Sequence, residues 1–428
     1  MQGTPVTKLR TTFICLVGAL LVIPTPASAQ TAAAPAQGAA AQPQSTIAPL
    51  TFREALDVAA TLNLELAAVR RGRAVREAEL RAAGQYVNPD ISAEITRDTP
   101  HGDVSIAYPL DIGRTRARRI GVAKEALAMA DVEEKTALAV LRRNVRLAFY
   151  GLMAAEQEAT LADDVLQVAQ RVKDVAQARF DEGAAPRLDV MQADLGVVRA
   201  RADLDLARSS RRAAQAELNA LLNRPPGQRI VLAGDMADTP PLPTIDRVTA
   251  LATGANVELL AIDREAAIES KTLDLLKAER VPIPTFSFGT ALNAPGEFNV
   301  GPHAGVSLSL PLFARNQGEI AGSMAKSDQI RARRESVRRE VEAKVFAALE
   351  RVTAQRAQVD AFRATLVPTA TELQGLAEES YRLGRSSILA ALDAQRSLRD
   401  VKYDYVQALL NLQSAVADLE DILGGPIL

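Results

Sequence analysis

The segment VSIAYPL at residues 104–110 returns as VSLSLPL at residues 306–312, roughly 200 residues later. In both segments apolar side chains alternate with small or polar ones, which is the period-two pattern of a strand with one apolar face. Residues 91–95 and 285–288 show the same alternation upstream of each segment. We expect each strand to be about ten residues long, which suits a tilted strand that crosses a bilayer. The sequence therefore predicts two pairs of amphipathic strands.

Other features return with similar spacing, which indicates an internal duplication. The segment NLELAA at 63–68 returns as NVELLA at 256–261. Farther on, a glycine, a leucine and an alanine recur with equal spacing as Gly183, Leu188, Ala193 and Gly384, Leu389, Ala394. We predict two repeats, residues 50–235 and 236–428, joined by the Pro- and Gly-rich stretch 224–244. Each repeat should hold a helix, a strand pair, a very long helix, a tight turn and a returning helix.

The long helices carry heptad seams, in which apolar residues alternate at steps of three and four. One seam is formed by Leu161, Val165, Val168, Val172 and Val175, and a longer one by Leu398, Val401, Tyr405, Ala408, Leu412, Ala415, Leu419 and Ile422. No proline falls between Pro109 and Pro186. A helix over 113–180 would be about 100 Å long at 1.5 Å per residue. We therefore predict coiled-coil hairpins, which a compact domain cannot accommodate.

The first residues predict export. Lys8 and Arg10 precede an apolar run at 13–23, and Ala27-Ser28-Ala29 is a small-x-small cleavage pattern, so residues 1–29 are expected to be a signal peptide. Residues 30–49, rich in Ala, Gln and Pro, are expected to be a flexible segment. Cys15 is the only cysteine and lies within the apolar run, so disulfides, thiolate metal sites and a cysteine nucleophile are excluded from the mature chain.

Several classes of function are disfavoured. The formal net charge is −2, and the loss of Lys8 and Arg10 with the signal makes it slightly more negative, so nucleic acid is not an expected partner. No later stretch has the roughly 18 continuous apolar residues of a transmembrane helix. A Gly-x-Ser-x-Gly elbow, a phosphate loop and a His-Glu-x-x-His helix are all missing from the sequence. We therefore expect no enzyme, no catalytic residue and no cofactor.

The number of predicted strands in each chain, four, indicates that the protein is an oligomer. Four strands cannot close a barrel, and a membrane-spanning backbone must have all its hydrogen bonds satisfied, so other copies of the chain must pair with the open edges. Two copies would give about eight strands and a filled interior, whereas three would give about twelve and leave room for a lumen. A homotrimer fits a conduit better.

These residues resemble the TolC-type outer-membrane efflux proteins over essentially the whole chain after residue 50. The resemblance is carried by LTFREAL at 50–56, VNP at 87–89, PLFARNQGEI at 311–320, YRLG at 381–384 and LDAQ at 392–395. It implies a mainly α fold with a small β part. Long coiled-coil hairpins and four transmembrane strands per protomer would form, as a trimer, a 12-strand barrel in outer-membrane lipid and a periplasmic α-helical tunnel.

The resemblance also implies partners, namely a periplasmic adaptor (membrane fusion) protein and an inner-membrane pump. Segment 311–320 is most similar to the cobalt-zinc-cadmium branch, whose pumps are of the resistance-nodulation-division type. This would make the chain a passive exit duct for heavy-metal cations. Drug efflux, type I secretion and a periplasmic coiled-coil adaptor are the alternatives, although an adaptor would carry one hairpin and lack the duplicated strand pairs.

Candidate site residues cluster at the tight turns. Gly183 and Gly384 end the seams, where glycine permits the positive φ of a helix-to-helix turn. The resemblance makes both turns periplasmic tips that meet the adaptor, with Phe180, Gly183, Tyr381, Gly384 and Arg385 as docking residues. Asp189 and Asp393 follow the turns. They are expected either to favour the positive helix ends or, in a trimer, to form an acidic ring at the tunnel entrance.

The two histidines, His101 and His303, occupy equivalent positions of the repeats beside the predicted outer turns. With no cysteine and no acid pair nearby in the sequence, they offer too few ligands for a metal site. We expect exposed loop residues and no metal site.

Overall fold

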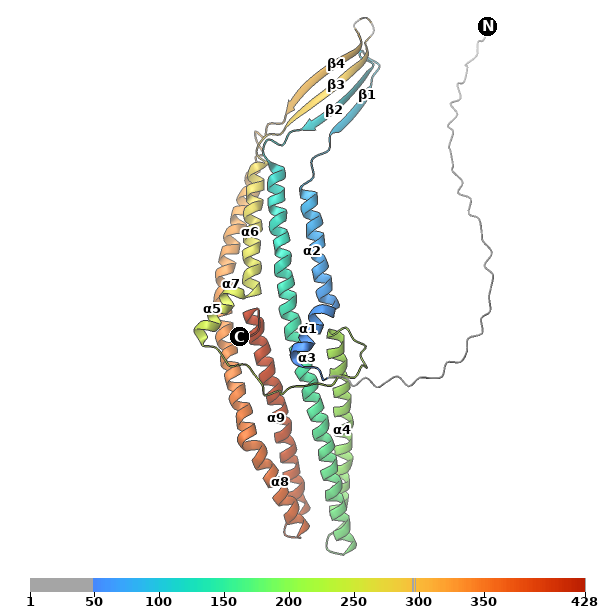
Figure 1. Ribbon diagram of the computed structural model, residues 1–428, viewed down its shortest axis with the longest axis vertical. Helices are drawn as coiled ribbons and strands as arrows, with labels where there is room; N and C mark the ends of the chain where they lie inside the picture. The colour runs from blue at the N-terminus through green and yellow to red at the C-terminus, as the bar shows by residue number, and fades with distance from the viewer. Residues whose placement is uncertain (1–48, 295, 297, 428) are drawn as a thin grey trace, which may run out of the picture. The chain divides into compact units, whose positions relative to one another are not determined.

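The computed structural model describes residues 49–294, 296 and 298–427. The predicted signal peptide at 1–29 lies outside the described residues, as does all but the last residue of the predicted flexible segment at 30–49. The described part is mainly helical with one four-stranded sheet, which confirms the predicted fold class (Figure 1). Its helices are α1 (Phe52–Leu62), α2 (Leu64–Ala83), α3 (Thr115–Asp181), α4 (Arg187–Leu221), α5 (Ile245–Ala255), α6 (Val257–Ala278), α7 (Gln317–Ala361), α8 (Val367–Arg382) and α9 (Ile388–Leu423).

The order of elements repeats in two copies, but each copy has two helices before its strand pair where the sequence predicted one. Helices α1 and α2, strands β1 (Asp90–Ile95) and β2 (Gly102–Pro109), and the α3–α4 hairpin form the first copy. Helices α5 and α6, strands β3 (Pro284–Ala294) and β4 (Phe298–Leu308), and the hairpin of α7, α8 and α9 form the second. The sheet thus joins the N-terminal ends of α3 and α7, and the tight turns lie at the far ends of the hairpins (Figure 1).

Equivalent asparagines make the same corner in both copies. Asn63 accepts a hydrogen bond from the backbone N–H of Leu66 and donates to the carbonyl of Leu221 at the end of α4. Asn256 likewise accepts from Leu259 and donates to Ile422 near the end of α9. Each side chain caps a helix start, and it also satisfies a carbonyl that the last turn of another helix leaves free. The repeated NLELAA motif therefore encodes a repeated corner.

The four strands form one antiparallel sheet in the order β1-β2-β3-β4. Ile91 pairs with Ile106, Ile106 with Phe288 and Phe288 with Ala304, so one face is apolar across all four strands. Its large side chains are exposed within the protomer. The other face carries small and polar residues. The predicted amphipathic strands are therefore confirmed, and their apolar face has no protein cover within the described chain.

The strand bounds differ from the expected ten residues. β1 has 6 residues and β2 has 8, whereas β3 and β4 each have 11. β4 ends at Leu308, so Leu310 and Leu312 lie beyond it and their predicted place in the strand is wrong. The strand ends there because Leu308 pairs with Pro284, the first residue of β3, so the ladder has no partner beyond it.

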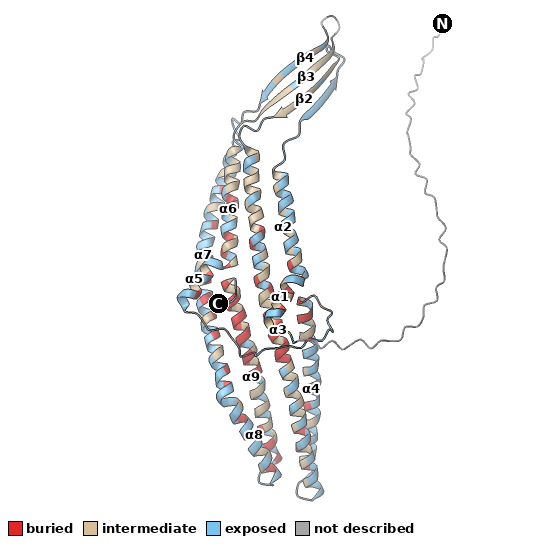
Figure 2. Ribbon diagram, viewed as in Figure 1, coloured by how far each residue is buried: buried red, intermediate tan, exposed pale blue. Residues whose placement is uncertain are grey.

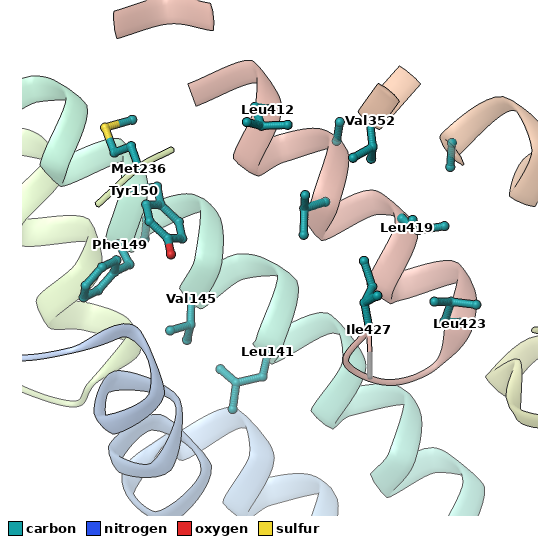
Figure 3. Packing of buried hydrophobic residues seen from close by; sticks show 14 of the residues in the cluster. Leu141, Val145, Phe149, Tyr150, Met236, Val352, Leu412, Leu419, Leu423 and Ile427 are labelled. Atoms are coloured by element: carbon teal, nitrogen blue, oxygen red, sulfur yellow. The ribbon is translucent and has the colours of Figure 1, made fainter. Parts of the chain in front are cut away.

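Helix α3 has 67 residues, which corresponds to about 100 Å and confirms the predicted length. Apolar residues of α3 and α9 pack together in the main core, together with residues of α1, α7 and the 222–244 connection (Figure 3). Figure 2 shows that the buried residues gather where these elements meet. Within the predicted α9 seam, Ala408, Leu412, Ala415 and Leu419 are all buried.

A polar cluster is enclosed in this core. The Arg146 guanidinium on α3 donates to the Gln413 amide oxygen at 2.9 Å and to a Glu420 carboxylate oxygen at 3.0 Å, both on α9. Gln413 in turn donates to the carbonyls of Met236 and Asp238 in the connection between the repeats. The face of the Phe52 ring lies 4.4 Å from the guanidinium. The cluster therefore ties both repeats and their connection to one another.

The two hairpins differ in one respect. Residues Phe362–Leu366 form a π-helical turn between α7 and α8, just before Pro368. Proline has no N–H to donate and crowds the carbonyl four residues earlier, and a π turn is one way to accommodate this. Helix α3 continues without such a turn over its whole length.

No helix in the described residues is long and apolar enough to cross a membrane.

Candidate functional site

The two tight turns have matching backbone geometry. Gly183 has φ of 73° and Gly384 has φ of 71°. In each turn the glycine N–H donates three residues back, to Phe180 or Tyr381, and the next N–H donates five residues back, to Arg179 or Ser380. This pattern ends a helix with a residue in the left-handed region, which glycine adopts without steric cost. The prediction of glycine turns is confirmed at both positions.

The tips of the two hairpins pack against each other around Tyr381, which is 2% exposed. Its ring lies in a small core formed by Val172, Ala176, Ala193, Ile388 and Ala391. Burial raises the pKa of Tyr381, and the nearby Asp189 carboxylate adds to this effect. Tyr381 is therefore buried in the core of the tip, although the family resemblance implied that it is a docking residue.

Arg179 joins the hairpins, and no pattern in the sequence indicated this role. Its guanidinium donates to the Tyr381 carbonyl at 2.7 Å and lies 4.8 Å from the centre of the Tyr381 ring. A Cβ atom at Gly384 would lie 3.6 Å from the same guanidinium. Because the partner is a backbone oxygen 202 positions away, only the fold reveals the contact.

An apolar surface remains at the tips. We call the exposed residues Phe180, Leu188, Leu383 and Leu389 the tip surface; Leu188 and Leu389 are 60% and 59% exposed. Arg385 is exposed beside them. Because large apolar side chains clustered in this way commonly mark interaction sites, the tip surface is the candidate contact region of the helical part.

Asp189 and Asp393 lie shortly after the two turns, near the starts of α4 and α9, as predicted. Asp189 is in the first turn of α4, which begins at Arg187, and is half-buried near Tyr381. Asp393 is in the second turn of α9 and is exposed.

The histidines do not share one environment. His101 lies in the connection between β1 and β2 and is half-buried, whereas the prediction made it exposed. His303 lies inside β4, paired with Gly289, so its predicted place in an outer loop is wrong. β4 begins at Phe298, several residues before the position equivalent to the start of β2. This longer strand carries His303 into the sheet.

An amphipathic sheet with two open edges, joined to paired coiled-coil hairpins, defines the subunit of an outer-membrane efflux channel. The chain belongs to the outer membrane efflux protein family, whose model matches residues 55–224 and 296–425. The family resemblance inferred from sequence is thereby confirmed. The protein is an outer-membrane efflux channel with a periplasmic helical extension, and it is not an enzyme.

Individual relatives carry more specific names. The chain is 23% identical to the cobalt-zinc-cadmium resistance protein CzcC of Cupriavidus metallidurans, over 89% of this chain and 92% of CzcC. It is 25% identical to the pyoverdine export outer membrane protein OpmQ of Pseudomonas putida, over 82% of this chain and 76% of OpmQ. The fold is similar to that in a crystal structure of CusC, with a TM-score of 0.72. The similarity covers 89% of this chain and 93% of CusC, at 15% sequence identity.

Proposed function

We propose that the chain is the passive exit duct of a tripartite efflux system and that its cargo is heavy-metal cations. The duct would be a homotrimer that docks on a periplasmic adaptor and, through it, on an inner-membrane pump of the resistance-nodulation-division type. The metal cargo is supported by the likeness to CzcC, which spans nearly all of both chains.

The trimer is supported by the open edges of the sheet. β1 and β4 are its outer strands, and each offers unpaired backbone groups that lipid cannot satisfy. Three copies joined edge to edge would give about twelve strands with a lumen. The apolar face would then meet lipid and the polar face would line the duct.

Docking of the adaptor is supported by the tip surface, which lies at the ends of the hairpins farthest from the sheet. A photocrosslinking side chain at Arg385 or Leu389 is expected to form an adduct with the adaptor in cells, because both residues are exposed at the tip. The same group at Leu64, which is 68% exposed but lies at the start of α2, should form none. Equal adducts from all three positions, or adducts from Leu64 alone, would remove the docking role from the tips.

Asp189 and Asp393 would form the acidic entrance of the tunnel. Three copies of each carboxylate would raise the local concentration of cations there. The choice of which cation is exported would be made by the pump. The duct would not bind any cation tightly, because it has to release every cation that enters it.

The cargo can be tested by deleting the gene. The deletion strain is expected to become sensitive to zinc, cobalt or cadmium and to change little toward lipophilic drugs, since the pump that loses its exit would be a metal pump. Growth in graded concentrations of each compound measures this, with a plasmid copy as the control. Loss of drug resistance with full metal tolerance would move the protein to the drug-efflux class.

Export of an organic molecule is the second candidate. It is favoured by the likeness to OpmQ, whose name states pyoverdine export. We rank it lower because the match covers 76% of OpmQ but 92% of CzcC.

A further inference from the structure

The turn that leads from β2 into α3 and the turn that leads from β4 into α7 meet at the end of α6. A Cβ atom at Gly113, in the first turn, would lie 3.0 Å from the carbonyl oxygen of Ala278, the last residue of α6. Asn316, in the second turn, donates to a carboxylate oxygen of the next residue, Glu279, at 3.3 Å. The two turns therefore belong to one surface, where the sheet adjoins the helices (Figure 1).

Both turns expose large apolar side chains. These are Leu110 and Ile112 in the first turn and Leu310, Leu312 and Phe313 in the second, with Phe313 90% exposed. Clusters of exposed apolar side chains commonly mark contacts with a protein or a membrane. Because these turns directly follow β2 and β4, the side chains adjoin the apolar face of the sheet, and the lipid that covers this face can cover them as well.

Four exposed cations lie in or next to the same turns, namely Arg114, Lys277, Arg280 and Arg315. Within the described chain none of the four forms an ion pair with a carboxylate, although neighbouring Arg118 does, with Asp274 at 3.4 Å. Their charge is therefore available to an anion from outside the chain. We call the five apolar side chains and these four cations the junction surface.

Tyr86 adds an amphipathic ring beside the first turn. It is exposed in the segment between α2 and β1, and the Arg116 guanidinium of α3 lies 4.0 Å from its ring centre. Arg116 also donates to the Gly84 carbonyl at 2.6 Å, which holds this segment against the start of α3. Tyrosine is enriched where a membrane meets water, since its ring is apolar and its hydroxyl is polar.

We propose that the junction surface is an interfacial anchor that binds anionic phospholipid headgroups. The helical extension is periplasmic, so the end of the sheet that adjoins it meets the leaflet that faces the periplasm. The apolar side chains enter the acyl-chain boundary of this leaflet, and the cations bind headgroup phosphates. An anionic headgroup fits better than a zwitterionic one, because a zwitterionic headgroup already carries its own cation.

The inference goes beyond the proposed export of metal cations and does not depend on the cargo. It rests on the proposed function in one respect, which is that the apolar face of the sheet meets lipid. The experiment therefore includes a separate probe of that face.

The chain has no tryptophan, so a single introduced tryptophan reports only on its own surroundings. We expect brominated acyl chains to quench the fluorescence of Phe313→Trp when the purified protein is reconstituted into vesicles of equal phosphatidylcholine and phosphatidylglycerol. Ile106→Trp, on the apolar face of the sheet, is the lipid-exposed control. Leu383→Trp, on the tip surface, is the water-exposed control, and iodide in solution should quench it instead.

Placing bromine on one lipid at a time measures the preference for a headgroup. Phe313→Trp should be quenched more by brominated phosphatidylglycerol than by brominated phosphatidylcholine in otherwise identical vesicles. Each cation near an anionic surface contributes about a factor of five in affinity, so adding Arg114→Asn and Arg280→Gln should lower the preference at least about fivefold. Asparagine suits position 114 because Asn316 has the same positive φ in the second turn. Arg315 is kept because it donates to two carbonyls of its own turn.

Arg199→Gln with Arg201→Gln removes the same charge from exposed positions of α4 and should leave the preference unchanged. Quenching of Phe313→Trp by iodide and not by lipid, while lipid quenches Ile106→Trp, would overturn the anchor and leave the lipid-facing sheet in place. Protection of Phe313→Trp from both quenchers would show that another subunit covers the turn, and equal quenching by the two lipids would show that the headgroup is not bound. Either result also overturns the inference. If lipid quenches neither Phe313→Trp nor Ile106→Trp, the proposed orientation of the sheet is wrong and the anchor fails with it.

Discussion

Replacing Ile106 with arginine is expected to prevent stable assembly of the protein in the outer membrane. Ile106 is near the middle of β2 on the apolar face, between Ile91 and Phe288. An arginine on the lipid face costs about 2–4 kcal/mol near the bilayer midplane, and a trimer would carry three of them. Heat-modifiable migration of the trimer on gels, together with membrane fractionation, measures the loss.

Ala107→Arg is the matched control for this change. Ala107 follows Ile106 in the same strand, so its side chain is on the polar face, and it pairs with Asp90 and Ser287. An arginine there has a carboxylate opposite it and water around it, so assembly should be retained. If both variants lose the trimer equally, the two faces of the sheet are wrongly assigned.

Arg146→Ala is expected to produce the largest loss of stability among substitutions in the helical part. The side chains of Arg146 and Glu420 are 7% and 6% exposed, so the change leaves a buried carboxylate without its cation and the Gln413 oxygen without a donor. Removing one partner of a buried pair costs about 3–5 kcal/mol. This is a large fraction of the free energy of unfolding of a typical protein.

Arg143→Ala, one turn earlier on α3, is the control. Arg143 pairs with Asp418 at 2.9 Å, but the two side chains are 38% and 30% exposed. Such a pair contributes about 0–1 kcal/mol. Thermal unfolding of the purified proteins should therefore separate the variants clearly. Equal destabilisation would show that the enclosed cluster contributes no more than a surface ion pair.

The helices, the strand pairs and the glycine turns could be predicted because each depends on a local pattern. The α9 seam repeats at steps of three and four, the strands alternate, and Gly183 and Gly384 interrupt the seams where a positive φ is needed. The repeat also showed that Asn63 and Asn256 occupy equivalent positions, although not that each bonds to the end of another helix.

Contacts between distant segments could not be predicted in this way. Arg179 bonds to a backbone carbonyl, which any residue could supply, so its sequence context carries no sign of the contact. The repeat predicts a loop position for His303 because it is equivalent to His101, but β4 is longer than β2 and includes His303. Its neighbour Asp103 becomes visible only when the register of three strands is known.

The π turn at Phe362–Leu366 makes the two hairpins differ in how strongly they resist bending. A continuous α-helix resists bending along its length, and α3 is continuous from the sheet to the tip. The second hairpin is interrupted by a turn with wider backbone spacing and by Pro368, which are common causes of a kink. Bending should therefore be easier within the second hairpin, near the π turn, than anywhere along α3.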